Sequence, residues 1–165
     1  TQNVIAEANG RHVVLLSTDK AVEPVNAYGA TKMLAEHLVL ANGGAVVRYG
    51  NVLGSRGSIL PVFRVQVSAG QPITITDPAM TRFVLTLTEA VALVREALTR
   101  PGLHLRRSPA ATVAQFAEAI APGYPTVIIG VRPGEKMHEK LSTDYTSEFA
   151  PRLSIYELRA LIEKA

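Results

Sequence analysis

Tyr28 and Lys32 lie four positions apart in a segment with helical spacing, so their side chains project from the same helix face. A tyrosine in water gives up its proton only near pH 10, which is too high for a base at neutral pH. A lysine ammonium close by favours the phenolate form. Such a pair can take the proton from a hydroxyl group while hydride leaves the same carbon. A surface tyrosine beside a solvated lysine has the same spacing, so the pair alone does not establish this chemistry.

A second candidate group is Ser17-Thr18-Asp19-Lys20, which directly follows a short apolar segment. Lys20 precedes Tyr28 by eight residues. An adjacent acid and base at the carboxyl edge of a sheet could transfer protons beyond those of a hydride step. Two exposed charges after a strand would look the same in the sequence.

Arg82 and Arg132 are candidates for an anion site, because a guanidinium group binds a diphosphate through two parallel charge-assisted hydrogen bonds. Glu135 follows Arg132 by three positions, across the turn-forming pair Pro133-Gly134. Taken singly, an arginine is more often a surface or salt-bridge residue. The four histidines are scattered and form no metal-binding motif, so we expect no metal site.

The first 51 residues, which must position Tyr28 and its neighbours, alternate between helix and strand. The expected elements are a helix that ends at residue 10, a buried strand at 12–16, a helix at 26–41 and a buried strand at 45–48. In the second helix Leu34, Leu38 and Ala41 share one face. This order is typical of a parallel α/β sheet. The polar residues that follow both strands, including Asn51, would then meet at the edge where ligands bind.

The remaining residues predict smaller elements that form an α+β lobe. We expect a helix with Leu60, Phe63 and Val67 on one face, a strand at 73–75, a helix after Thr86 with Val91, Val94 and Leu98 inward, a strand at 126–131, and helices carrying Phe116 with Ile120 and Leu158 with Ile162. Three helix starts have the spacing of a capping box: Thr86 with Glu89, Thr112 with Gln115, and Ser154 with Glu157.

Composition narrows the class of protein. The chain has 165 residues, 47% of them hydrophobic, and a formal net charge of +3. This amount of apolar sequence supports a folded core. The positive charge is too small and too scattered to indicate a nucleic-acid-binding protein, but it suits a pocket for a small anion. Cysteine is absent, which removes disulfides and thiolate nucleophiles. No membrane span or signal peptide is visible, so we expect no membrane partner and a cytoplasmic location.

Four blocks of sequence carry a resemblance to a known family. They are STDKAVEPVNAYGATKMLAE, VVRYGNVLGSRGSILPVF, ITITDPAMTRFVLTLTEAV and IIGVRPGEKMHEKL. In this order they resemble the extended short-chain dehydrogenase/reductases and, within them, the UDP-N-acetylglucosamine 4,6-dehydratases of the polysaccharide biosynthesis protein family. The resemblance covers residues from about 13 to 141. It implies the second half of a Rossmann-type parallel sheet, without its N-terminal strands, plus a small α+β substrate lobe.

The resemblance also implies roles for single residues. Tyr28 and Lys32 match the catalytic tyrosine and its lysine partner, which also contact the cofactor. Thr18 matches the hydroxyl that holds the sugar 4-OH, Asp19 the acid that assists loss of the 6-hydroxyl, and Lys20 the base that takes the C5 proton. The implied reaction oxidises C4, eliminates water across C5 and C6, returns hydride to C6 and inverts C5. Plain C4 epimerisation needs no such acid–base couple.

The substrate side is implied in the same way. Arg82 and Arg132 match arginines that bind the diphosphate of a UDP-sugar, and Asn51 matches an asparagine near the same group. Glu135 matches a carboxylate that accepts the ribose hydroxyls of uridine. The implied cofactor is NADP, with NAD as the alternative, and the implied full-length protein is a homo-oligomer.

The glycine-rich turn that holds a dinucleotide in this family is not in the chain. We therefore interpret the chain as the C-terminal part of a longer enzyme, with residues 1–51 as the partial cofactor-binding half and 52–165 mainly as the nucleotide-sugar lobe, of which about 81–100 pack back on the first half. Alone it should have a free sheet edge, bind the cofactor negligibly and be inactive. The alternatives are a UDP-sugar 4-epimerase of the same superfamily and a non-catalytic nucleotide-sugar-binding fragment.

Overall fold

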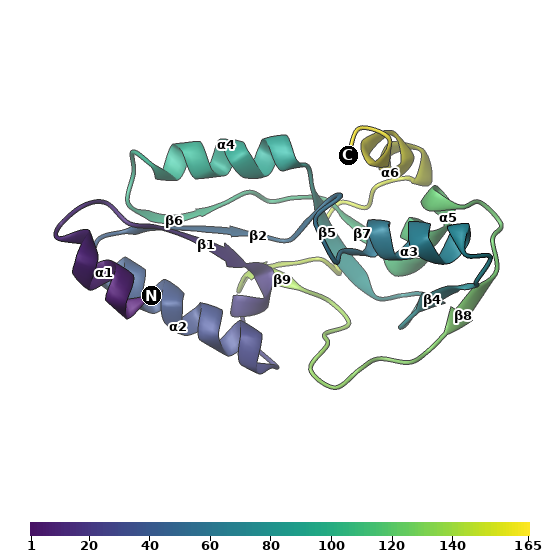
Figure 1. The fold of residues 1–165 in the computed structure, drawn as a ribbon, viewed down its shortest axis with the longest axis horizontal. Helices are drawn as coiled ribbons and strands as arrows, with labels where there is room; N and C mark the ends of the chain where they lie inside the picture. The colour runs from purple at the N-terminus through teal and green to yellow at the C-terminus, as the bar shows by residue number, and fades with distance from the viewer.

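A parallel sheet of three strands in the order β1-β2-β6 forms one part of the computed structural model, which describes residues 1–165 (Figure 1). Its strands are β1 (Val14–Thr18), β2 (Ala45–Tyr49) and β6 (Gly102–Leu105). Helix α2 (Ala27–Ala41) covers one face and α4 (Leu87–Ala97) covers the other, while the short α1 (Gln2–Ala8) lies beside α2. The predicted α/β class is therefore confirmed.

The second part consists of short strands and three helices beyond the carboxyl ends of β1 and β2 (Figure 1). Strand β5 pairs with β3 in parallel and with β7 in antiparallel fashion, β4 pairs with β8, and β9 pairs with β10. The elements are β3 (Asn51–Val52), α3 (Ile59–Ser68), β4 (Ile73–Ile75), β5 (Thr81–Leu85), β7 (Ala110–Thr112), α5 (Val113–Ile120), β8 (Thr126–Ile128), β9 (Lys140–Ser142), β10 (Tyr145–Thr146) and α6 (Ile155–Ile162).

The largest core cluster, of 14 buried residues, lies in this second part, where Phe63, Phe116 and Leu158 bring α3, α5 and α6 together. These three residues belong to the predicted inward faces. All three predicted capping boxes are present, at the starts of α4, α5 and α6. Each box satisfies otherwise free backbone N–H groups at a helix start, which fixes where these helices begin.

The packed face of α2 differs from the face that Leu34, Leu38 and Ala41 share, and the inward face predicted for α4 is confirmed only at Val94, which packs against the core. Leu34 is 58% exposed, and α2 instead packs through Ala35 and Val39. In α4 the predicted Val91 and Leu98 are 48% and 59% exposed, while the buried residues are Ala90, Leu93 and Ala97. Both helices have apolar residues on two faces, and the face with smaller side chains allows the closer approach to the sheet.

Strand β1 also differs from its prediction. It begins two residues later than expected, and Leu16 is 45% exposed although we expected burial on both faces. The reason is its place at the sheet edge, where β2 is its only partner. In β2, which has a neighbour on each side, Ala45, Val46 and Val47 are fully buried. The division of the chain at residue 51 stays a prediction. The sheet itself is not confined to the first 51 residues, because β6 from further along the chain is its third strand.

Candidate active site

Strand β1 ends at Thr18 and turns directly into a single 3₁₀ turn, η1 (Asp19–Ala21), which places Asp19 and Lys20 at the carboxyl edge of the sheet. Thr18 Oγ1 accepts from the backbone N–H of Lys20 (3.4 Å) and donates to Asp19 Oδ1 (3.0 Å). The threonine thus caps the turn and orients the carboxylate at once. The polar residues after β1 are held by local hydrogen bonds.

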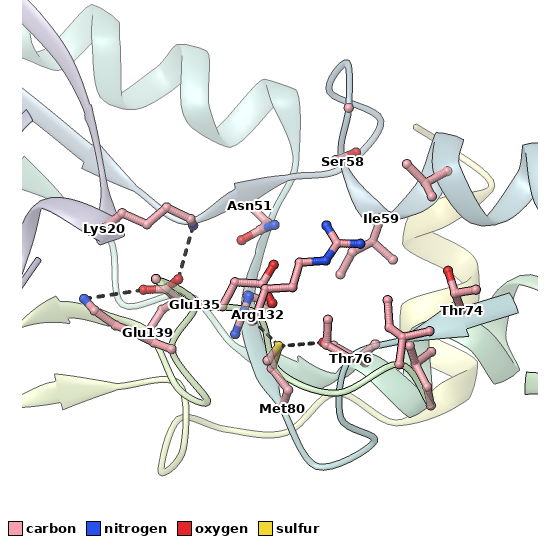
Figure 2. A pocket seen from close by; sticks show the side chains of 18 of the residues that line it. Lys20, Asn51, Ser58, Ile59, Thr74, Thr76, Met80, Arg132, Glu135 and Glu139 are labelled. Atoms are coloured by element: carbon pink, nitrogen blue, oxygen red, sulfur yellow. Dashed lines mark hydrogen bonds and ion pairs between the residues drawn. The ribbon is translucent and has the colours of Figure 1, made fainter. Parts of the chain in front are cut away.

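The Lys20 ammonium lies between two buried carboxylates. Its Nζ is 3.1 Å from Asp19 Oδ1. It is also 3.3 Å from Glu139 Oε1, a contact that Figure 2 shows. The two acids are 0% and 2% exposed. Asp19 Oδ2 and Glu139 Oε2 have no hydrogen-bond partner in the protein. Glu139 Oε2 lies 3.7 Å from the Lys136 ammonium, so the Oδ2 of Asp19 is the oxygen that is left to accommodate a proton or a polar ligand.

Burial raises the pKa of Asp19, and the negative charge of Glu139 adds to this effect, while Lys20 opposes it. Burial alone would lower the pKa of Lys20, but the charges of Asp19 and Glu139 outweigh burial and raise it. Asp19 is therefore disposed to keep a proton, which suits an acid. Lys20 is held as an ammonium in the site as it stands, which opposes its predicted role as a base until its proton moves.

Tyr28 and Lys32 lie in the first two turns of α2, whose first turn is capped by Asn26 through Gly29 N (2.8 Å). Lys32 Nζ donates to the backbone oxygen of Leu16 in β1 (3.0 Å). Tyr28 is 54% exposed and, with Lys32, Thr18 and Lys20, lines a cavity of about 720 Å³. The predicted tyrosine, both lysines and the threonine therefore share one cavity, and the fully buried Asp19 contacts two of its lining residues, Thr18 and Lys20.

A second cavity, of about 450 Å³, brings together Lys20, Asn51, Arg82, Arg132 and Glu135 (Figure 2). All four predicted substrate residues therefore surround one space, although they come from distant parts of the chain. The two cavities have Lys20, Asn51, Gly57 and Ser58 in common, so Lys20 and Asn51 lie at their junction.

Arg82 supplies an unneutralised positive charge to this second cavity. Its guanidinium is buried and donates to the backbone oxygen of Thr81 (2.7 Å) and to the sulfur of Met80 (2.9 Å), with no carboxylate in ion-pair distance. A buried cation without a counter-ion favours an anionic ligand. The buried Oδ1 of Asn51 and Oε2 of Glu135 also lack protein partners and add hydrogen-bond acceptors.

Three residues of the site were not predicted. Glu139 contacts Lys20, although it lies in the block that contains Arg132 and Glu135. Asn26 donates to the backbone oxygen of Gly134 (2.7 Å) and so fixes the loop that carries Glu135. Gly50 leaves no room for a side chain, because a Cβ there would lie 2.6 Å from Phe83 Cβ and 3.1 Å from Asp19 Oδ2. The sequence marked Glu139 only as an acidic residue in the same block as Arg132 and Glu135, with no spacing that pairs it with Lys20.

Two further observations concern metals and membranes. No three His, Cys, Asp or Glu side chains gather closely enough to hold a metal ion. No helix combines the length and hydrophobicity that crossing a membrane requires.

Several curated proteins are similar in sequence. An uncharacterized membrane protein of Methanocaldococcus jannaschii is 42% identical over 167 residues, which cover 86% of this chain and 50% of that protein. A UDP-glucose 4-epimerase of Rickettsia rickettsii is 39% identical, covering 86% of this chain and 47% of the epimerase. A probable polysaccharide biosynthesis protein of Bacillus subtilis is 41% identical over 86% of this chain and 27% of its own length. The chain thus spans half the length of these relatives or less.

Solved structures share the fold. Pen from Bacillus thuringiensis matches with a TM-score of 0.91 and 32% identity, over 99% of this chain and 66% of Pen. The UDP-glucose 4-epimerase of Thermus thermophilus in complex with NAD has a TM-score of 0.76 at 19% identity, over 98% of this chain and 67% of its own. A dTDP-glucose 4,6-dehydratase of Bacillus anthracis in complex with NAD reaches 0.75 at 14% identity, over 98% and 64%. The last two show the fold alone, the Rossmann-type fold of nucleotide-sugar epimerases and dehydratases.

The curated relatives therefore include proteins named UDP-glucose 4-epimerase, and the solved structures with the same fold include a dTDP-glucose 4,6-dehydratase. Residues 1–157 match the family described as polysaccharide biosynthesis protein, which is nearly the whole chain. The site residues from Thr18 to Glu139 all lie within this match. The chain belongs to the polysaccharide biosynthesis protein family.

Proposed function

We propose that the protein acts as a nucleotide-sugar 4,6-dehydratase on UDP-N-acetylglucosamine, with inversion at C5. The observation that supports this most directly is the buried carboxyl of Asp19 in hydrogen-bond contact (3.1 Å) with Lys20, which lines the cavity that also holds Tyr28. An elimination of water needs an acid and a base beside the carbon that is oxidised, and this arrangement supplies both.

The residues present fit one end of a nicotinamide dinucleotide. Tyr28, Lys32 and Ser17 line the same open cavity, and the buried Oγ of Ser17 has no hydrogen-bond partner in the protein. These groups can bind the ribose next to the nicotinamide. A bound cofactor would supply the hydride acceptor for C4 and the hydride that returns to C6. The chain holds no glycine-rich turn for the pyrophosphate, so the fit is limited to this end.

The proton steps follow from the chain's own residues. Tyr28 as phenolate would take the proton of the sugar 4-hydroxyl, held by Thr18. A ketone at C4 makes the C5–H bond acidic, so Lys20 as a free amine could remove that proton. Asp19 in its acid form would give its proton to the departing 6-hydroxyl, which leaves as water.

Lys20 must give up its ammonium proton before it can act as a base, because its raised pKa keeps that proton in the substrate-free site. Asp19 carries a separate proton, which it gives to the leaving group. Lys20 lines the open cavity of Tyr28, so its proton can pass to water there before elimination. The raised pKa of Lys20 therefore slows this step without preventing it.

The second cavity would hold the rest of the substrate. Arg82 and Arg132 would bind the diphosphate, and Glu135 would accept the ribose hydroxyls of uridine. Asn51, at the junction of the two cavities, would then contact the phosphate next to the sugar. This order places the sugar ring beside Lys20 and the nucleoside further into the second cavity.

A UDP-sugar 4-epimerase is the second candidate, because relatives with about 40% identity bear that name. Epimerisation requires Tyr28 and Lys32 but no elimination. A 4-epimerase would therefore use the same first step and leave Asp19 and Lys20 as structural or sugar-binding residues.

The test uses the protein expressed from its complete gene, incubated with UDP-N-acetylglucosamine and NADP⁺ or NAD⁺ in deuterated water. A dehydratase yields a 4-keto-6-deoxy sugar with deuterium at C5, whereas an epimerase yields the C4 epimer with hydrogen at C5. Lys20→Met should abolish deuterium incorporation. The control Lys140→Met alters a half-buried lysine paired with Glu23, outside both cavities, and should leave the product unchanged. An epimer as sole product would refute the dehydratase proposal.

A further inference from the structure

Glu139 is a buried acid in the site that none of the proposed reaction steps uses. It lies directly before β9, and its backbone is fixed on both sides by Ser147. The N–H of Glu139 donates to Ser147 Oγ (2.9 Å), and the N–H of Ser147 donates to the oxygen of Glu139 (2.8 Å). Ser147 Oγ in turn shares a hydrogen bond with Thr81 Oγ1 (2.7 Å). Glu139 is therefore held rigidly against β5.

The side chain of Glu139 reaches across to the turn that carries Lys20 (Figure 2). Its Oε1 is 3.3 Å from Lys20 Nζ, and its Oε2 is 3.7 Å from the ammonium of Lys136. Lys136 also donates to the backbone oxygen of Val22, just after the turn. Glu139 thus anchors the turn at two points, directly through Lys20 and indirectly through Lys136.

The charges show what this contact achieves. Lys20 has two carboxylate neighbours but needs only one negative charge to balance it. If Asp19 were its only neighbour, the Lys20 charge would hold Asp19 as a carboxylate, which cannot give a proton to a leaving group. With Glu139 as the balancing charge, Asp19 does not have to be ionised to neutralise Lys20.

We propose that Glu139 is a positioning residue that serves as the permanent counter-ion of Lys20, so that Asp19 keeps the proton it delivers to the departing hydroxyl. This inference rests on the proposed dehydratase function. The negative charge of Glu139 raises the pKa of Asp19 and also that of Lys20, as this role requires. The other charges that face the cluster are Lys136 and, from β5, Arg82, whose charge lowers the pKa of Lys20.

Glu139→Gln removes the charge and keeps the shape. Without that charge the pKa values of both Asp19 and Lys20 fall, so both limbs of the pH profile of kcat should move to lower pH. We expect kcat at the original optimum to fall about tenfold to a hundredfold, with KM little changed, because Asp19 is less often protonated and the Lys20 side chain is less well placed. Glu139→Asp keeps the charge at a greater distance and should give an intermediate profile.

The control is Glu23→Gln, the same chemical change in an exposed carboxylate that pairs with Lys140. It should leave the pH profile in place. A Glu139→Gln variant that is slower over an unshifted profile would show a merely structural role and overturn the proposal. If this variant does not fold, Glu139→Asp decides in the same way, since an unshifted profile there also overturns the proposal.

A second measurement separates this inference from the proposed function. The carboxyl carbon of Asp19 is titrated by ¹³C NMR in the substrate-free protein, wild type and Glu139→Gln. The titration midpoint should fall in the variant, and an unchanged midpoint would overturn the counter-ion role whatever the reaction is. A lowered midpoint in a protein that forms no 4-keto-6-deoxy product would support the role of Glu139 and refute the dehydratase function.

Discussion

Gly29 allows α2 to approach the turn that carries Asp19 and Lys20 unusually closely. A Cβ at this position would lie 2.3 Å from the backbone oxygen of Lys20 and 3.0 Å from Cβ of Pro24. The nearer atom belongs to the backbone, so it cannot swing aside as the end of a side chain could. Restoring an ordinary contact of 3.4 Å requires α2 and the turn to separate by about 1 Å in the Gly29→Ala variant.

Two opposing terms determine the stability of Gly29→Ala. Alanine is favoured over glycine within a helix by roughly 1 kcal/mol, and forcing an extra methyl into a packed contact costs about 1–3 kcal/mol. We expect a net loss of up to about 2 kcal/mol in the free energy of unfolding. Because Tyr28 is the adjacent residue, it moves relative to Asp19 and Lys20, and a shift of about 1 Å can reduce turnover about a hundredfold.

Urea denaturation measures the first effect, and the rate of product formation measures the second. Gly29→Ser serves as a graded companion, since its larger side chain should increase both losses. If Gly29→Ala were as stable as the wild type and equally active, the close approach of α2 to the turn would not constrain the site, and this reasoning would be refuted.

Three further predictions concern single side chains. Burial raises the pKa of Asp19 above its ordinary value of 3.8, so the folded protein binds this proton more tightly than the unfolded chain does. The folded protein therefore loses stability as pH rises above about 4. Asp19→Asn should remove that loss in urea titrations between about pH 4 and 8. Tyr28→Phe should leave stability within about 0.5 kcal/mol, since the ring is 54% exposed, and lower turnover about a hundredfold or more. Arg48→Met should cost about 3–5 kcal/mol in the free energy of unfolding by leaving the buried Glu36 without its partner, and adding Glu36→Gln should recover most of it.

The parts of the fold that depend on neighbours in sequence were predictable. A capping box joins a residue to one three positions later, so Thr86, Thr112 and Ser154 mark helix starts without knowledge of the fold. The inward face of α2 was not predictable in this way, because Leu34 and Ala35 are both apolar and only contact with the sheet selects one of them.

Strand β6 was missed for a related reason. Gly102–Leu105 is short and contains a glycine and a histidine, neither of which favours a strand. The segment becomes a strand because β2 offers it a free edge. Such pairing is a long-range effect that the local sequence does not encode.

The same distinction holds for the site. Asp19 with Lys20, and Tyr28 with Lys32, are near neighbours in the chain, so spacing alone could suggest a joint role. The roles of these four residues stay proposals, which rest on the family resemblance together with the observed geometry. Glu139 reaches Lys20 only because β9 lies against the turn η1, and no spacing rule could have paired them.

The common wall of the two cavities has a consequence for inhibitors. A small fragment in the cavity of Tyr28 and another in the cavity of Arg132 would each lie next to Lys20 and Asn51. Joining them with a short linker over that wall would make the second attachment intramolecular, so the joined compound gains effective concentration beyond the affinity of either fragment. A linker carrying an acceptor for the Lys20 ammonium would suit the crossing point, and chemists could optimise each end separately before connecting them.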